Sequence, residues 1–191
     1  MEIKDYIKII DNTLRPETLE VIMKYAKELK YEEAEIVTQQ QEKPFVENTT
    51  RKTLLKPLYN NSQSLTEVHW AHVFNKIFKE AITAYLNAFN IPSNTIAKLE
   101  GVQILKYEPG GFYTWHVDHG IHLNRKISCI FYLNDEYEGG SIQFAFPAKN
   151  ESFEIKPKEN RMILWPSNFL YPHRVTPVEK GSRYSAVCWA V

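Results

Sequence analysis

Hydrophobic and polar positions change their spacing near the middle of the chain. Before residue 99 the apolar residues recur at helical intervals, and after it they gather in short runs of β-branched and aromatic residues. Pro16 and the acidic Glu17 open a first helical pattern, which predicts a helix ending at about Leu29. Its apolar face consists of Leu19, Ile22, Met23 and Ala26.

A second helix is predicted to begin after Ser64, which would form a capping box with Glu67. Its apolar face holds Val68, Phe74, Ile77, Phe78, Ala81, Ile82 and Tyr85. Between the two helices, residues 31–61 are polar and irregular, so a loop or a weak hairpin is expected there. A loop of this length in a compact domain is often a binding loop or a lid.

The second half reads as a series of short strands separated by Gly, Pro, Asn and Asp. The runs are GVQILKY, ISCIFYL, GGSIQFAF, SFEI, RMILW and RYSAVCWAV. Evenly spaced strands with such turns indicate an antiparallel sandwich or a jelly-roll barrel. We therefore expect one α+β domain, mainly β, over residues 1–191. Residues 1–98 would give helical and loop support, and residues 99–191 the barrel strands.

Composition narrows the range of partners. The chain has 191 residues, of which 23 are Lys or Arg and 23 are Asp or Glu, so its formal charge is zero. This balance disfavours a nucleic-acid partner, which usually calls for a basic surface. No signal peptide and no membrane-spanning run is seen, and Cys129 and Cys188 lie in apolar stretches. A cytoplasmic protein with reduced thiols is expected.

Candidate chemistry gathers in the stretch YEPGGFYTWHVDHG, residues 107–120. His116 and Asp118 are two positions apart, and on a strand such residues face the same way. His173, on a distant strand, would supply a third ligand. Two imidazoles and one carboxylate leave three octahedral positions open, as in non-haem iron(II) oxygenases. On ligand types alone a zinc hydrolase remains an alternative.

Ten residues after His173 comes Arg183, and strand alternation leaves open whether it faces inward or outward. An inward arginine would need an anionic partner. The combined pattern of HxD, distal His and this arginine resembles the iron(II)- and 2-oxoglutarate-dependent dioxygenases. LEGVQILKYEPGGFYTWHVD, RKISCIFYLNDEYEGGSIQF and PHRVTPVEKGSRYSAVCWAV together look like the prolyl 4-hydroxylase branch.

The resemblance implies a double-stranded β-helix, or jelly-roll, core buttressed by the N-terminal helices. It implies that Fe(II) binds His116, Asp118 and His173, and that 2-oxoglutarate binds Tyr107 and Arg183. Where the family often has a threonine the chain has Ile142, so Ser185 is expected to supply the hydroxyl. The residues implied for the substrate side are Tyr113, Arg125, Trp189 and Glu100.

The function implied is hydroxylation of a peptidyl proline, similar to procollagen-proline 4-dioxygenases, with succinate and carbon dioxide as co-products. Ascorbate is the expected reductant, and a monomer that binds a proline-containing peptide is expected. Arg183 stands where collagen-type enzymes usually carry lysine, which leaves the substrate open. Alternatives are hydroxylation of peptidyl lysine, of a free amino acid or of another small metabolite, and a non-catalytic cupin-like binding module. A nucleobase demethylase is disfavoured, because Trp189 occupies the place of that family's further arginine.

Overall fold

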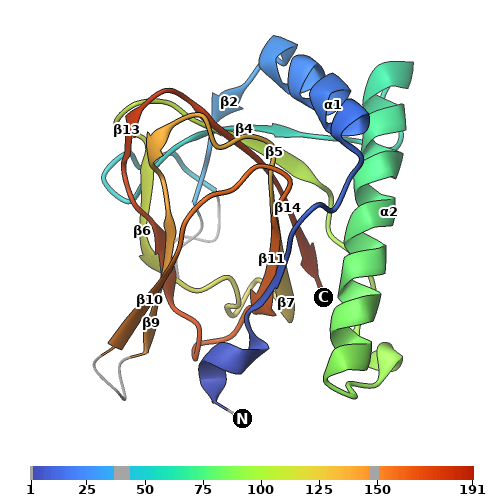
Figure 1. The fold of residues 1–191 in the computed structure, drawn as a ribbon, viewed down its shortest axis with the longest axis vertical. Coiled ribbons are helices and arrows are strands. Elements are labelled where there is room, and N and C mark those ends of the chain that lie inside the picture. The colour runs from blue at the N-terminus through green and yellow to red at the C-terminus, as the bar shows by residue number, and fades with distance from the viewer. Residues whose placement is uncertain (1, 37–43, 147–150) are drawn as a thin grey trace.

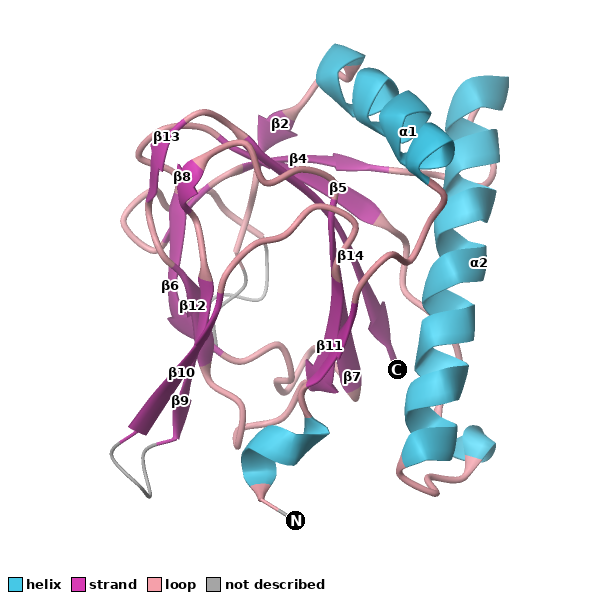
Figure 2. Ribbon diagram, in the orientation of Figure 1, coloured by secondary structure: helices cyan, strands magenta, loops and turns pink. Residues whose placement is uncertain are grey.

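The fold consists of two antiparallel sheets that face each other, with two helices against one of them (Figure 1). The computed structural model describes residues 2–36, 44–146 and 151–191. Figure 2 shows that strands make up most of the body and that the long helices lie on one side. The predicted class, mainly β with a jelly-roll core and buttressing helices, is confirmed.

The larger sheet has seven strands, each antiparallel to its neighbours. In spatial order they are β1 (Lys8–Ile10), β11 (Met162–Pro166), β7 (Ile127–Tyr132), β14 (Arg183–Ala190), β5 (Gln103–Tyr107), β4 (Leu54–Pro57) and β2 (Glu32–Glu33).

The smaller sheet has five strands. Their order is β10 (Glu151–Ile155), β9 (Ile142–Phe146), β12 (His173–Val175), β6 (Phe112–His116) and β3 (Arg51–Lys52). A separate ribbon pairs β13 (Val178–Lys180) with β8 (Glu138–Gly139). Apolar side chains from both sheets, such as Ile130 and Phe144, share one buried cluster, so the two sheets enclose a common interior.

Two helices cover the outer face of the seven-stranded sheet. They are α1 (Pro16–Glu28) and α2 (Leu65–Ala88), and two single 3₁₀ turns, η1 (Ile3–Tyr6) and η2 (Ser93–Thr95), flank them. Phe74 and Phe78 of α2 are fully buried against Ile104 and Phe131 of the sheet. In the described part of the chain, neither helix is both long and apolar enough to cross a membrane.

The start of α2 differs from the predicted capping box. Ser64 does cap the helix, since its Oγ accepts the Glu67 backbone N–H at 3.3 Å. The Glu67 carboxylate does not return to Ser64, whose N–H donates to Ser62 Oγ instead. It accepts the backbone N–H of Tyr59 at 3.0 Å and pairs with Lys56 at 3.3 Å. Glu67 thus ties the helix to β4 rather than completing its cap.

Strand β14 shows how one strand serves two environments. All eight of its residues are buried, because helices lie on one side and the second sheet on the other. Tyr184, Ala186, Cys188 and Ala190 pack toward the helices, whereas Val187 and Trp189 face the interior between the sheets. By the two-residue period of a strand, Arg183 and Ser185 share that inner face. The face of Arg183, which the sequence left open, is therefore inward.

The described parts of residues 31–61 contain three short strands where a loop or weak hairpin was predicted. β2 pairs with β4 at the edge of the larger sheet, and β3 pairs with β6 at the edge of the smaller one. Ile36 also forms an antiparallel bridge with Phe45. The segment therefore joins the two sheets; residues 37–43, in the middle of the predicted loop, lie outside the described residues.

Candidate metal and cofactor site

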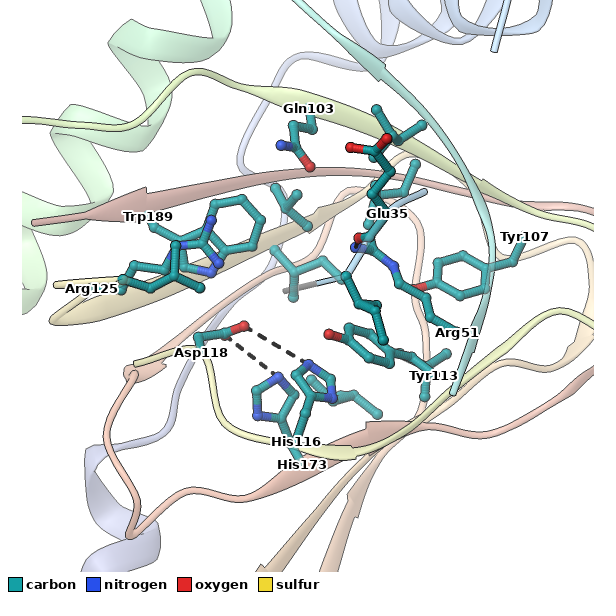
Figure 3. A pocket seen from close by; sticks show the side chains of 18 of the residues that line it. Glu35, Arg51, Gln103, Tyr107, Tyr113, His116, Asp118, Arg125, His173 and Trp189 are labelled. Carbon is teal, nitrogen blue, oxygen red and sulfur yellow. Dashed lines mark hydrogen bonds and ion pairs between the residues drawn. The ribbon is translucent and has the colours of Figure 1, made fainter. Parts of the chain in front are cut away.

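A cavity of about 630 Å³ lies between the two sheets. Side chains from β5, β6, β7, β12 and β14 line it, and the segment 31–61 forms part of its wall. Figure 3 shows His116, Asp118 and His173 in its middle, with Arg125 and Trp189 on one side and Tyr107 on the other. The cavity therefore holds most of the residues that the sequence singled out.

His116, Asp118 and His173 form a compact cluster. His116 ends β6 and His173 begins β12, and the two residues are direct partners in the antiparallel register. The Nε2 atoms of His116 and His173 lie 3.8 Å and 3.5 Å from the nearer Asp118 carboxylate oxygens. One candidate ligand atom from each residue lies within 4.8 Å of the others, so the three can share one metal ion. The predicted convergence of the distant His173 on the HxD pair is thus what the fold produces.

Nδ1 of each imidazole already forms a hydrogen bond with a backbone carbonyl. Nδ1 of His116 donates to the Thr114 carbonyl at 2.8 Å, and Nδ1 of His173 donates to the Tyr171 carbonyl at 3.1 Å. A carbonyl can only accept, so each Nδ1 carries a proton, and in the neutral ring Nε2 is then the nitrogen that presents a lone pair to the cavity. Backbone carbonyls that fix the tautomer in this way are a common support for metal-binding histidines.

Protonation states in the cluster also suit a cation. Burial, assisted by the nearby His173, lowers the pKa of His116 to about 3. Burial alone would raise the pKa of Asp118, but His173, His116 and a hydrogen bond from Ser128 outweigh it and lower that pKa. The neutral imidazole and the ionised carboxylate are the forms that bind a divalent metal.

A β-bulge turns Tyr113 to the same side as His116. These residues are three positions apart, so a regular strand would place them on opposite faces. On β12, however, His173 and Val175 are two positions apart and pair with His116 and Tyr113, so β6 carries one extra residue. The Tyr113 ring consequently stacks on the His116 ring, with 3.5 Å between centroids. Burial raises the pKa of Tyr113 to about 12.

Arg183 lies fully buried at the Tyr107 side of the cavity. Its Nη1 donates to the Gly140 carbonyl at 2.9 Å, but Nε and Nη2 have no hydrogen-bond partner among the described residues. Its guanidinium carbon lies 4.8 Å from the Tyr107 ring centre and 5.0 Å from that of Tyr132. A buried cation with two idle donors is costly unless an anion binds there.

Two further donors lie beside this arginine. Tyr132 and Ser185 are direct partners across β7 and β14, and neither hydroxyl has a partner within residues 2–36, 44–146 and 151–191. A guanidinium together with two hydroxyl groups fits the far carboxylate of 2-oxoglutarate. Ile142, where the family often has threonine, presents only an aliphatic side chain to the cavity. The sequence reasoning missed Tyr132, which the register with Ser185 would have indicated.

Three of the four predicted substrate-side residues meet at the opposite side, and Tyr113 lies apart from them against His116. Arg125 donates to both oxygens of Glu100, over distances of 2.7 to 3.0 Å. The same guanidinium lies 3.6 Å from the Trp189 ring centre, so the indole supports its flat face. Arg125 and Trp189 line the cavity, while Glu100 stands behind them and fixes the arginine. The sequence did not indicate this mutual pairing, and the substrate-side role of these residues stays a prediction.

Several cavity residues gave no signal in the sequence. Arg51 of β3 lies 4.8 Å from the Tyr113 ring centre and donates to the Glu35 carbonyl at 3.3 Å. Trp165 meets the His173 ring edge-on, at 5.0 Å between centroids. Arg51 and Glu35 belong to the predicted loop, and only the pairing of β3 with β6 brings them to the cavity.

Comparison with known protein families places the second half of the chain. Residues 102–191 match the model of the 2OG-Fe(II) oxygenase superfamily. A PKHD-type hydroxylase of Synechococcus sp. (strain CC9605) is 34% identical over 99 residues, which are 49% of this chain and 43% of that protein. Prolyl 3-hydroxylase 2 of Homo sapiens is 41% identical over 66 residues, 34% of this chain and 9% of that protein. The chain thus spans less than half the length of these curated relatives.

Solved structures extend the likeness to nearly the whole chain. A prolyl-4-hydroxylase of Pseudomonas putida has a TM-score of 0.69 at 17% identity, covering 96% of this chain and 91% of that one. A prolyl hydroxylase of Trichoplax adhaerens, solved with a hypoxia-inducible-factor peptide, has a TM-score of 0.71 at 18% identity, covering 96% and 82%. At such low identities, the structural likeness shows the fold alone. The predicted resemblance to prolyl 4-hydroxylase-like 2-oxoglutarate oxygenases is confirmed, since residues 102–191 match the 2OG-Fe(II) oxygenase model and the solved neighbours share the fold.

Proposed function

We propose that this chain is an Fe(II)- and 2-oxoglutarate-dependent hydroxylase that acts on a prolyl residue of a peptide. One observation carries the proposal: a single cavity combines the His116, Asp118 and His173 cluster with the buried Arg183, two of whose donors are unused among the described residues. A structural zinc site would explain the cluster but not the arginine. The proposed enzyme is one domain over residues 1–191 and acts as a monomer.

Each part of the cavity then has a task. Nε2 of His116, Nε2 of His173 and one oxygen of Asp118 would hold the metal. Arg183, with the hydroxyl groups of Tyr132 and Ser185, would bind the far carboxylate of 2-oxoglutarate, and Tyr107 would pack beside it. When bound, Fe(II) and 2-oxoglutarate supply an oxidant that hydroxylates a C–H bond, with succinate and carbon dioxide as co-products.

The remaining task is to orient the substrate and keep water away from it. Tyr113 and Trp189 line the cavity on two sides of the metal cluster, and a pyrrolidine ring fits between two such aromatic side chains. Arg125, held by Glu100, can donate to a peptide carbonyl. Fixing the ring near the cluster converts an encounter between molecules into a reaction within one complex. Three of the four similar proteins named above are prolyl hydroxylases, and their names support the same choice of acceptor.

Peptidyl lysine is the second candidate. Glu32, Glu33 and Glu35 line the cavity wall, and none of them has an ion-pair partner in the described part of the chain. Three carboxylates would attract a lysine ammonium group, whereas they contribute nothing specific to a prolyl ring. Arg51 opposes this preference, because its guanidinium faces the same cavity.

Matched peptides decide between the candidates. The chain is incubated with Fe(II), 2-oxoglutarate and ascorbate, together with peptides that differ only in one proline or lysine, and with the two free amino acids. Mass spectrometry should find one added oxygen on the proline peptide, with succinate formed in step. Asp118→Ala should abolish both signals. Arg174→Met is the control, because Arg174 follows His173 on β12 but lies over Trp115, which is exposed on the outer face.

The possible results separate cleanly. Oxygen on the lysine peptide alone moves the proposal to the second candidate. Oxygen on a free amino acid alone rejects a peptide acceptor but keeps the reaction. A chain that forms no succinate with any acceptor, and that does not bind Fe(II), is a binding module rather than an oxygenase.

A further inference from the structure

Asp118 ends a chain of two buried serine hydroxyl groups. Ser128 Oγ donates to Asp118 Oδ2 at 2.6 Å, and Ser128 Oγ lies 2.7 Å from Ser167 Oγ. Ser128 and Ser167 are each only 1% exposed. The first of these distances is that of a hydrogen bond to an ionised oxygen, which is short and strong.

The number of available protons fixes the direction of the hydrogen bonds that link Ser167, Ser128 and Asp118. A serine hydroxyl has one proton, and an ionised carboxylate can only accept. Because Ser128 gives its proton to Asp118, the proton between the two serines must belong to Ser167. Ser167 therefore donates to Ser128, and Ser128 donates to Asp118. Hydrogen bonds aligned in one direction polarise one another, so Ser167 strengthens the bond that Ser128 makes.

Backbone contacts fix both serines in place. Ser128 lies within β7, and its partner in the register is Trp165 of β11, two residues before Ser167. The Ser167 N–H donates to the Lys126 carbonyl at 3.0 Å, and the Ser167 carbonyl accepts the His119 N–H at 3.0 Å. The chain of hydroxyl groups thus joins two neighbouring strands to the residue that follows Asp118, and it has little freedom to move.

The two carboxylate oxygens of Asp118 are not equivalent. Oδ2 accepts the Ser128 proton and also lies 3.5 Å from His173 Nε2, whereas Oδ1 lies 3.8 Å from His116 Nε2 and receives no hydrogen bond from any residue whose placement is described. We propose that Ser128 and Ser167 are positioning residues that make Asp118 a one-oxygen metal ligand, through Oδ1. The inference rests on the proposed function, because it takes Asp118 as a metal ligand.

A one-oxygen carboxylate matters for this reaction. Three protein atoms on one face of the metal leave three positions open, and 2-oxoglutarate needs two of them. A carboxylate that turned to bind through both oxygens would occupy one of these positions. By holding Oδ2, Ser128 keeps the position available. The predicted consequence is a change in metal binding that does not depend on any substrate.

The test measures Co(II) binding to the metal-free chain by visible absorption, without 2-oxoglutarate. Ser128→Ala should raise the Kd for Co(II) about 10- to 100-fold, the usual effect of losing a group that orients a ligand. It should also change the shape of the Co(II) spectrum, because the carboxylate becomes free to bind through both oxygens. Ser128→Thr keeps the hydroxyl and should restore both values. Ser167→Ala should give a smaller rise in the same direction.

A second readout uses 2-oxoglutarate itself. Its Kd for the Co(II)-loaded chain should rise in Ser128→Ala and recover in Ser128→Thr. The matched control is Phe131→Leu, which removes buried side-chain atoms from the same strand but on the helix side. That variant should leave Co(II) affinity and spectrum unchanged, even where it lowers the melting temperature of the metal-free chain.

Each outcome is decisive. Wild-type Co(II) affinity and spectrum in a folded Ser128→Ala variant would overturn the inference while leaving the proposed function intact. A wild-type chain that does not bind Co(II) overturns the proposed function and the inference together. If Ser128→Ala does not fold without metal, Ser167→Ala serves as the test, since it leaves the hydrogen bond from Ser128 to Asp118 in place. An unchanged Kd for Co(II) in Ser167→Ala overturns the inference that Ser167 strengthens that bond.

Discussion

The two sides of the cavity treat an arginine in opposite ways. On one side Arg183 is fully buried and leaves Nε and Nη2 without a partner among the described residues. On the other side Arg125 is also largely buried, but Glu100 receives three of its hydrogen bonds and Trp189 covers its face. Among the described residues, Arg183 thus lacks partners for part of its guanidinium, whereas Arg125 has an anionic partner.

This difference indicates that Arg183 binds a charged group of a ligand and that Arg125 binds a neutral one. An unpaired guanidinium that is shielded from water is stabilised most by a ligand carboxylate, because the carboxylate offsets the free-energy penalty of the buried charge. A guanidinium already neutralised by Glu100 gains little from a second anion, but its edge remains a well-placed donor for a neutral carbonyl. We therefore expect Arg183 to govern the cofactor and Arg125 to govern the substrate.

The largest effect is expected from Arg183→Met, which keeps the length of the side chain but removes its charge. Loss of a buried charge pair amounts to about 3–5 kcal/mol, so the KM for 2-oxoglutarate should rise at least about a hundredfold. Without 2-oxoglutarate the variant should be as stable as the wild type or more stable, because it no longer buries an incompletely paired charge. Succinate formation and thermal unfolding, each measured with and without 2-oxoglutarate, give both values.

The control for this variant is again Arg174→Met, on the outer face of β12. 2-Oxoglutarate should raise the melting temperature of the control and of the wild type, but not that of Arg183→Met. An unchanged KM in Arg183→Met would contradict the assignment. A strongly destabilised variant without 2-oxoglutarate would show instead that Arg183 serves the fold.

A smaller effect is expected from Glu100→Gln, which takes the anionic partner from Arg125. The side chains of Arg125 and Glu100 are 14% and 26% exposed, so water replaces part of the lost interaction. A loss of about 1–3 kcal/mol in unfolding free energy is expected. The KM for the peptide should rise while the KM for 2-oxoglutarate stays unchanged. A variant that changed both equally would remove the distinction between the two sides of the cavity.

Much of the site followed from the sequence because strands impose strict geometry. The jelly-roll pattern brought His173 to the HxD pair, although Asp118 lies in a bend after the end of β6 and not on the strand as predicted. The face of Arg183 could not be decided from alternation alone, because every residue of β14 is buried and no polar outer face marks the register. Only the helices on one side of the sheet and the cavity on the other make the choice visible.

The features that could not be predicted from the sequence depend on contacts between distant strands. Ser128 sits in the continuous apolar run ISCIFYL, and nothing in that run indicates that its hydroxyl meets Asp118. The bulge in β6 appears only in its pairing with β12, and it is what turns Tyr113 inward. Local pattern likewise missed β3, since a two-residue strand has no periodicity of its own.

The smallest effect is expected from an arginine that is paired at the surface. Arg161 donates to both carboxylate oxygens of Asp11, at 2.7 Å and 3.0 Å, and so joins the start of β11 to the end of β1. The hydrogen bond from Arg161 is the main cause that holds the pKa of Asp11 far below its usual range, and Lys158 adds to it. Because water screens such a pair, Asp11→Asn should lower the unfolding free energy at neutral pH by only about 0.2–1 kcal/mol.

The pH dependence of this pair distinguishes it from the two arginines of the cavity. A carboxyl group whose pKa is lower in the folded state stabilises the fold above its unfolded pKa, which is 3.8 for Asp11. That contribution is lost as the pH falls through this value toward the folded pKa, so wild type and Asp11→Asn should converge in acid. Urea unfolding at neutral and acidic pH, repeated at high salt, measures the convergence. A difference that persisted in acid or at high salt would mean that Asp11 acts through packing, and Arg161 would then no longer serve as the reference outside the cavity for Arg183 and Arg125.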